Sequence, residues 1–266
     1  MRTHPYAGPV RPTLPRAALL AVWGTAALDG RTSPDEAVDR VAPGGAPLRF
    51  GGLPGEAVVG LTLALGRIRA LGGTGLRLVL PVPGDPAGLP GPRAFIEEAV
   101  ACRAAVVTVG EANDVRIGLL PGIRNAWQAH RVLPGSDVDL PLLAEADRAL
   151  TETLRRSAEE LVRLDVARWR PEVAQAVAGI RDGAGPAASL PPGLPNRAHR
   201  VLALALRVGA IVELAGQDPG GAVSAAEMAS RAAALARLAT ASRRALVAAC
   251  NAVLEPAPVP RSRTER

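Results

Sequence analysis

The spacing of the apolar residues changes part-way along this 266-residue chain, and that change constrains the fold more than any other feature. Up to about residue 135, short apolar runs such as 76–82 and 104–109 alternate with helix-like segments. From residue 140 onward, apolar residues recur every three or four positions, which is the spacing of an amphipathic helix. We therefore expect an α/β N-terminal half and an all-α C-terminal half.

The two apolar runs 76–82 and 104–109 flank a segment, 92–103, that begins with Pro92 and is typical of a helix. A strand, a helix and a second strand in this order predict a βαβ unit with two parallel strands and a right-handed crossover. Two further strands, 115–120 and 126–132, follow after short turns and are expected to be antiparallel. The predicted sheet is mixed, with the parallel βαβ unit at its centre.

Four segments follow from this division. We expect a disordered arm over residues 1–15, an α/β domain over 16–135, a helical domain over 136–255 and a disordered basic tail over 256–266. Two Ser-x-x-Glu sequences, Ser33–Glu36 and Ser224–Glu227, are capping boxes that predict helix starts.

The apolar stretch Ala17–Leu28 follows several arginines, so it could be a secretory signal. Pro15 before it and Gly30 after it favour a helix instead. Cys102 and Cys250 lie far apart, a pattern that fits a reducing compartment better than a disulfide framework. No apolar run reaches the length of a membrane span. We expect a cytoplasmic protein that does not bind membranes.

All 31 basic residues are arginine, a bias that GC-rich codons explain. Without lysine, the chain has no phosphate-binding Walker lysine, no Schiff base to a pyridoxal cofactor and no lysine general base. It also contains no HExxH, GxSxG or GxGxxG motif. We therefore expect no cofactor. The net charge of +6 is spread along the chain, so nucleic acid is not an expected partner.

Polar residues follow both strands of the predicted βαβ unit: Asp85 after the first, and Glu111, Asn113 and Asp114 after the second. Parallel strands would bring these residues to one edge of the sheet, where ligands of α/β folds bind. Carboxylates and an amide can hold a hard cation or the hydroxyls of a polar ligand. The same residue types also stabilise ordinary turns, so both interpretations stay open.

Two other groups have similar alternatives. Cys102 and His130 could form a nucleophile and base, or Cys102 could be a small buried hydrophobe. Arg168, Trp169 and Arg170 have the composition of an interface hot spot, but Trp169 could also cover a helix kink at Pro171.

The segment Arg197–Ala215 is apolar around most of its circumference. Neighbouring helices or another subunit must cover such a helix. The leading hypothesis is a non-enzymatic interaction or regulatory protein that associates through its helical half, with itself or with another protein. The alternative is a small-molecule or metal-binding enzyme with its site at the C-terminal edge of the sheet.

At LRLVLPVPGDPAGLPGP and at LDVARWRPE, the chain resembles an uncharacterised family of proteins from high-GC actinobacteria. The resemblance covers most of residues 16–254. It implies a cytoplasmic bacterial protein, and it transfers no activity and no functional residues.

Overall fold

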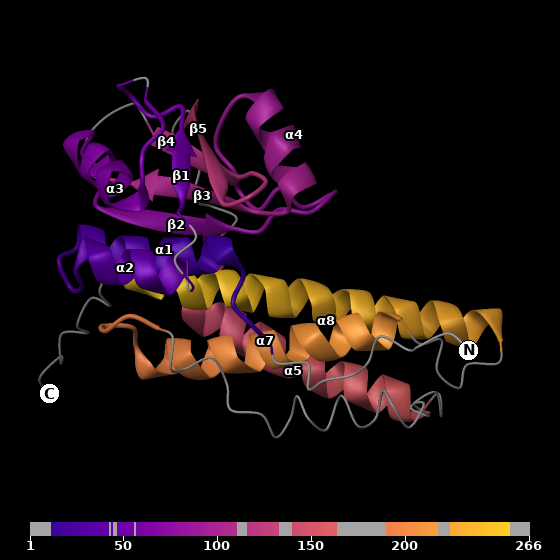
Figure 1. The fold of residues 1–266 in the computed structure, drawn as a ribbon. Helices are drawn as coiled ribbons and strands as arrows, with labels where there is room; N and C mark the ends of the chain where they lie inside the picture. The colour runs from indigo at the N-terminus through magenta and orange to yellow at the C-terminus, as the bar shows by residue number, and fades with distance from the viewer. Residues whose placement is uncertain are drawn as a thin grey trace, which may run out of the picture.

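The fold was analysed in a computed structural model, which describes residues 12–42, 44, 47–55, 57–110, 116–132, 140–163, 190–217 and 224–255. Within these residues the strands lie in the N-terminal half, and the longest helices lie in the C-terminal half (Figure 1). The predicted division into an α/β half and a helical half is confirmed.

The described strands form one five-stranded sheet in the order β1-β5-β4-β3-β2. Only β1 and β5 are parallel, and the other neighbouring pairs are antiparallel, so the predicted mixed sheet is confirmed. The strands are β1 Arg49–Gly51, β2 Gly75–Val79, β3 Ala105–Val109, β4 Arg116–Pro121 and β5 Ala126–Val132.

The predicted parallel pairing of 76–82 with 104–109 is wrong. Strand β2 pairs with β3 in the antiparallel sense, with Gly75 opposite Val109 and Val79 opposite Ala105. The chain therefore enters β3 at the same end of the sheet at which it left β2. Between the two strands lie the long loop 80–92 and helix α4, Arg93–Cys102. Together they return the chain to the end of β2, where Ala105 pairs with Val79, and not to the start of β2.

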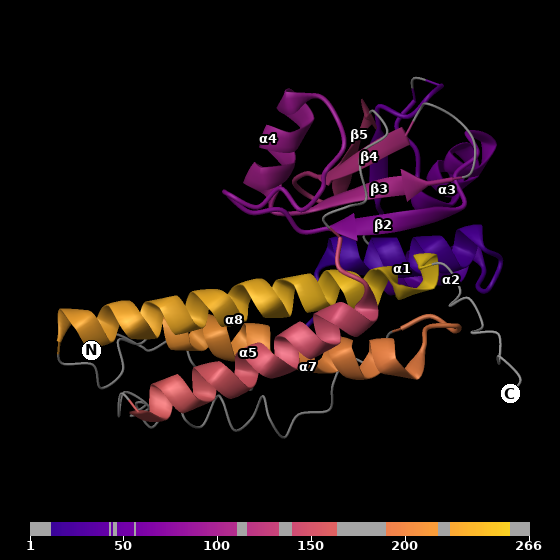
Figure 2. The same cartoon turned by 180° about the vertical axis from the view of Figure 1, so that it is seen from behind.

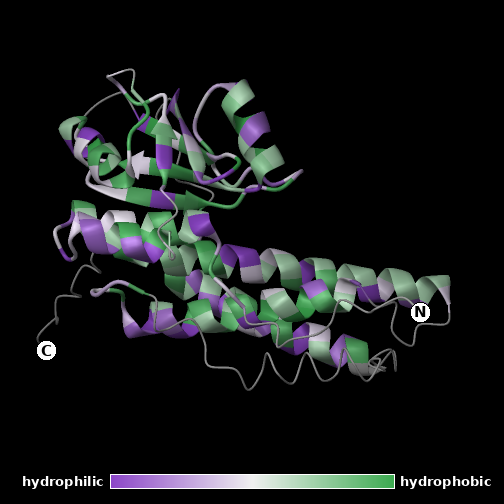
Figure 3. Ribbon diagram, in the orientation of Figure 1, coloured by the Kyte–Doolittle hydropathy of each residue, from purple (hydrophilic) through white to green (hydrophobic). Residues whose placement is uncertain are grey.

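Helices lie on both sides of the sheet. Helix α4 covers one face, where Phe95 and Ala99 pack with Val79, Val107 and other strand residues in a small core. A larger core contains residues from α1 Arg16–Leu28, α2 Pro34–Val41, α3 Leu61–Ala70 and the sheet, and it continues into the helical half. One apolar core thus connects the two halves, and Figure 3 shows hydrophobic residues in the strands and in α1.

The helical half consists of α5 Leu143–Arg163, α7 Asn196–Gly216 and α8 Ala225–Asn251, followed by a short 3-10 turn, Ala252–Leu254. Seen from behind in Figure 2, these helices project beyond the edge of the sheet, and the C-terminal part of α8 lies under α1 and β2. The predicted capping box at the start of α8 is confirmed, because Ser224 and Glu227 exchange both hydrogen bonds. At Ser33 only the serine cap forms, since the Glu36 carboxylate accepts a hydrogen bond from Thr32 instead.

Two side chains close the outer edge of β2, where no described strand pairs with it on the side away from β3. The Thr25 hydroxyl accepts a hydrogen bond from the Leu76 N–H at 2.9 Å and donates one to the Leu76 carbonyl at 3.0 Å. The Asn251 side chain does the same for Leu78: its Oδ1 accepts at 2.9 Å and its Nδ2 donates at 3.0 Å. Both side chains are buried, so helices α1 and α8 satisfy backbone groups that water does not reach.

Candidate functional site: a groove between two helices

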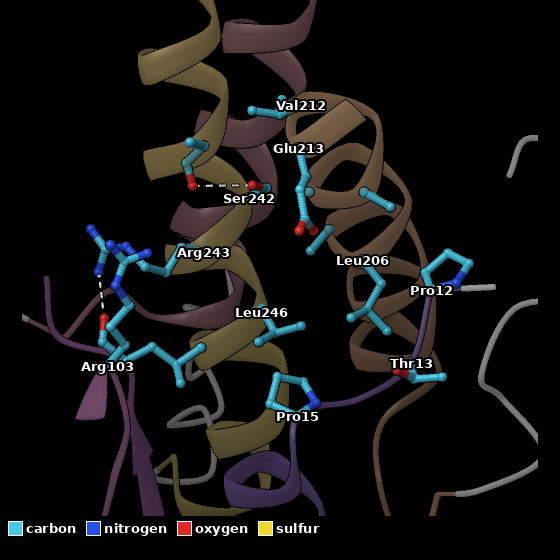
Figure 4. Close-up of a pocket in the computed structure, with 15 residues that line it drawn as sticks. Pro12, Thr13, Pro15, Arg103, Leu206, Val212, Glu213, Ser242, Arg243 and Leu246 are labelled. Atoms are coloured by element: carbon cyan, nitrogen blue, oxygen red, sulfur yellow. Dashed lines mark hydrogen bonds between the residues drawn. The ribbon is translucent and has the colours of Figure 1, made fainter. Parts of the chain in front are cut away.

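A groove of about 700 Å³ runs between α7 and α8. It extends to the short segment before α1 and to the region where β2 and α4 end (Figure 4). The residues that line it are Pro12, Thr13, Pro15, Leu80, Arg103, Ala205, Leu206, Gly209, Ala210, Val212, Glu213, Ala239, Ser242, Arg243 and Leu246.

Small side chains where α7 meets α8 explain why this groove exists. Ala205, Gly209 and Ala210 of α7 face Ala239 and Ser242 of α8, so the two helices come close without filling the space above their contact. A Cβ atom added to Gly209 would meet only the Ser242 Oγ, at 3.9 Å, and would therefore fit without strain. The larger Leu206, Leu246 and Leu80 border this floor, which makes the groove mostly apolar.

One side of the groove carries two arginines. Arg243 of α8 is largely buried, and its guanidinium donates to the Leu80 carbonyl at 2.8 Å and to the Asp85 carboxylate at 2.7 Å. Arg103, the residue that ends α4, is exposed, and it has no ion pair with any residue that the structure describes. Its backbone is left-handed, with φ at +55°, a conformation that favours glycine.

The other side of the groove carries a carboxylate. Glu213 projects from α7 opposite the two arginines (Figure 4). It is exposed and, like Arg103, forms no ion pair within the described part of the chain. The groove therefore has an apolar floor, a basic side and an acidic side.

Asp85 lies behind the basic side and holds it in place. Its carboxylate accepts hydrogen bonds from Arg243 and, at 3.1 Å, from Arg244, while its other oxygen accepts from the Ala87 N–H. The hydrogen bond from Arg243 is the main reason why the pKa of Asp85 lies below its ordinary value of 3.8. Asp85 thus anchors the loop after β2 to helix α8.

The other residues predicted to join Asp85, namely Glu111, Asn113 and Asp114, lie outside the described residues. The strand pairing removes the reason to expect them near Asp85. The chain leaves β2 at Val79 and leaves β3 at Val109, and these two residues lie at opposite ends of the antiparallel pair. Arg168, Trp169 and Arg170, the predicted interface cluster, also lie outside the described part of the chain.

The cysteines and the two described histidines do not line the groove. Burial raises the pKa of Cys250 to about 12. Burial and the nearby Glu98 carboxylate also raise the pKa of Cys102, which favours the thiol over the nucleophilic thiolate. The His130 Nε2 lies 3.8 Å from Glu98, and the His199 ring lies against the Pro195 carbonyl. Within the described residues, no three His, Cys, Asp or Glu side chains are grouped as metal ligands would be.

The apolar helix predicted over Arg197–Ala215 is α7, and α8 packs along it. Sequence reasoning identified this helix but not the groove. The signal was the set of small residues on both helices, which can be located only once the register between α7 and α8 is known. None of the helices in the described part of the chain combines the length and hydropathy needed to cross a membrane.

Two family models match this chain and together cover most of it. The N-terminal domain of the Rv1486c-like proteins matches residues 17–140, and their C-terminal domain matches residues 144–247. The chain belongs to the Rv1486c-like family. The groove of this family member is lined mainly by residues within the C-terminal match, whereas Leu80 and Arg103 lie within the N-terminal match.

Similar proteins occur in mycobacteria, which confirms the resemblance to an actinobacterial family. The uncharacterised protein Rv1486c of Mycobacterium tuberculosis is 31% identical over 238 aligned positions, which cover 73% of this chain and 80% of the relative. The uncharacterised protein ML1804 of Mycobacterium leprae is 29% identical over 297 aligned positions, which cover 90% and 97% of the two chains. No solved structure matches the chain. The names of these relatives state no activity.

Proposed function

We propose that this member of the Rv1486c-like family is a non-enzymatic protein that associates with a protein partner through its helical half. The observation that carries the proposal is the groove between α7 and α8, which lies on that half and has an apolar floor. Its lining is formed mainly by two neighbouring helices, and an amphipathic helix from a partner fits such a surface. The small residues of the floor let a third helix approach closely.

The energetics are adequate for such an association. Each leucine-sized side chain that a partner buries on the floor contributes roughly 1.5–3 kcal/mol. Three such side chains contribute about 5–9 kcal/mol, which is of the same order as the cost of association, so contacts along the sides of the groove add the remaining binding energy.

The experiment fills the groove without disturbing the helix. Gly209→Leu places a leucine where a Cβ has room and the groove lies above it. Gly216→Leu makes the same change on the same helix at a position where nothing lies within 4 Å and which does not line the groove. Both variants replace glycine by a better helix former, so neither should lose stability through the helix itself.

The wild type and the two variants are each expressed in the source organism and purified from its cells, and their masses are measured by native mass spectrometry. For the wild type and for Gly216→Leu, we expect the mass of a complex, which is either a multiple of the chain mass or the chain mass plus that of a second protein. For Gly209→Leu, we expect this complex to be lost. A bare monomer for the wild type, or the same complex for all three proteins, contradicts the proposal.

A second candidate function is a small-molecule or metal-binding enzyme. The groove volume favours it, because about 700 Å³ lies within the range of ligand pockets. The sequence alone suggested Asp85, Glu111, Asn113 and Asp114 as ligand-binding residues for this candidate, but Asp85 does not line the groove. A small mass excess in the spectra of the wild type and of Gly216→Leu, lost in Gly209→Leu, would favour this candidate over the first.

The cluster Arg168–Arg170 belongs to the first proposal as a further part of the interface. If the cluster contributes, Trp169→Ala weakens the complex seen by native mass spectrometry. An unchanged complex would limit the interface to the groove.

A further inference from the structure

From the opposite charges on the two sides of the groove, we infer that the partner segment is an amphipathic helix with acidic residues along one flank of its apolar stripe and basic residues along the other, and that these charges fix the direction in which it binds. This inference rests on the proposed function, because it specifies the segment that the groove takes.

Two charged residues of the groove form no ion pair within the described residues. Arg103 lies on the side of the groove formed by α8 and the end of β2, and Glu213 lies on the α7 side (Figure 4). Neither has an ion-pair partner among the residues that the structure describes, whereas Arg243 beside Arg103 is already bound by Asp85. Arg103 and Glu213 are therefore the two charges that a bound segment can neutralise.

Direction follows from geometry. A helix whose apolar stripe lies on the groove floor points one flank toward Arg103 and the other toward Glu213. Turning the helix end for end exchanges these flanks. A helix with one acidic and one basic flank therefore forms two attractive pairs in one direction and two repulsive pairs in the other, as charged flanks do in coiled coils.

The backbone at Arg103 supports a binding role for its side chain. A left-handed conformation at the end of a helix normally favours glycine, and an arginine there costs about 1 kcal/mol. Within the described residues, the Arg103 side chain has no hydrogen bond or ion pair that would offset this cost. A contact with a partner would explain why an arginine stands at this position.

The probes are two synthetic helical peptides of 14 residues with identical composition. Both carry leucines along one stripe, glutamates along one flank and lysines along the other, and the second peptide has its flanks exchanged. Each carries a photo-crosslinking benzoyl-phenylalanine at its N-terminus. Binding to the full chain is measured by fluorescence anisotropy. Mass spectrometry then locates the crosslink at one end of the groove, near Leu246 and Pro15, or at the other, near Val212 and Ala239.

We expect the two peptides to bind with similar affinity but to crosslink at opposite ends, each with a preference of about 10-fold for one end, since exposed ion pairs are individually weak. In the double variant Arg103→Gly with Glu213→Gln, the two groove charges without an ion pair are removed, while Arg243 stays bound to Asp85. This preference should disappear, while affinity falls only about 2- to 10-fold. Arg103→Gly relieves the left-handed backbone, so the change cannot be attributed to unfolding.

Two failures are distinguishable. If neither peptide binds, or if Gly209→Leu and the wild type bind them equally, the groove is not the docking surface, and the proposed function fails together with this inference. If the peptides bind in the groove but each crosslinks equally at both ends, or both crosslink at the same end, the charges do not set direction. In that case the inference fails while the proposed function stands.

Discussion

Replacing Asn251 with leucine should destabilise the protein far more than the same kind of change at an exposed position of α8. The Asn251 side chain forms two hydrogen bonds with the backbone of Leu78, at 2.9 and 3.0 Å, and it is only 9% exposed. Leucine has a similar shape but no polar atoms. The variant therefore leaves one buried N–H and one buried carbonyl of β2 without partners.

Each such unsatisfied group costs about 1–3 kcal/mol, so the two together cost about 2–6 kcal/mol. The apolar leucine recovers about 1 kcal/mol through burial. The free energy of unfolding should fall by about 3 kcal/mol, a large part of the stability of an ordinary domain. Urea titration followed by circular dichroism measures this change, provided that the slope of the transition stays constant.

The control is Thr240→Leu, which makes a similar polar-to-leucine change at an exposed position of the same helix. It should change stability by less than about 0.5 kcal/mol. If Asn251→Leu costs no more than this control, the hydrogen bonds at the edge of β2 contribute nothing measurable. The explanation given for the junction between sheet and helices would then be refuted.

Two further predictions concern titratable groups. Because the pKa of Asp85 is lowered in the folded state, its charge contributes stability above its ordinary pKa of 3.8, and this contribution is lost as the pH falls. At pH 7, the free energy of unfolding of the wild type should exceed that of Asp85→Asn by about 1–2 kcal/mol, and this difference should shrink when unfolding is measured at pH values closer to 3. A difference that does not change with pH would disprove this prediction. With its pKa raised to about 12 by burial, Cys250 should resist iodoacetamide at pH 8 until the protein unfolds. Intact-mass measurements check this result, and labelling of Cys250 in the folded protein at the rate of an exposed thiol would contradict it.

The sequence predicted the elements well because their signals are local. The strand 126–132 coincides with β5, and the helix expected over Arg197–Ala215 differs from α7 by one residue at each end. Proline and glycine at the boundaries, capping serines and apolar spacing all act within a few residues.

The relative direction of two strands does not depend on local sequence signals, and the direction predicted for 76–82 and 104–109 was wrong. The assumption was that a helix between two strands returns the chain to its starting edge. Here the loop 80–92 is long enough to cross the sheet before α4 begins, so α4 brings the chain back to the end of β2. The candidate site that depended on parallel strands lost its basis for the same reason.

Asp85 shows why residue type alone does not reveal a role. As a sequence feature it was a ligand candidate or a turn residue, and the structure places it against Arg243 and Arg244, which follow it by more than 150 positions. Arg103 gave no signal at all, because its importance comes from a left-handed backbone and from a groove made by other segments. Contacts between distant segments determine both roles.

The two side chains that close β2 become available at different times during translation. Thr25 is made before the strand, but Asn251 follows Leu78 by 173 residues. Throughout translation of the intervening segment, the sheet carries an open edge in the region of Leu78. An open edge of this kind can add a strand from another molecule. A nascent or truncated chain that ends before α8 is complete is therefore the form most exposed to aggregation through β2, and the last turn of α8 removes this exposure by closing the edge at Leu78.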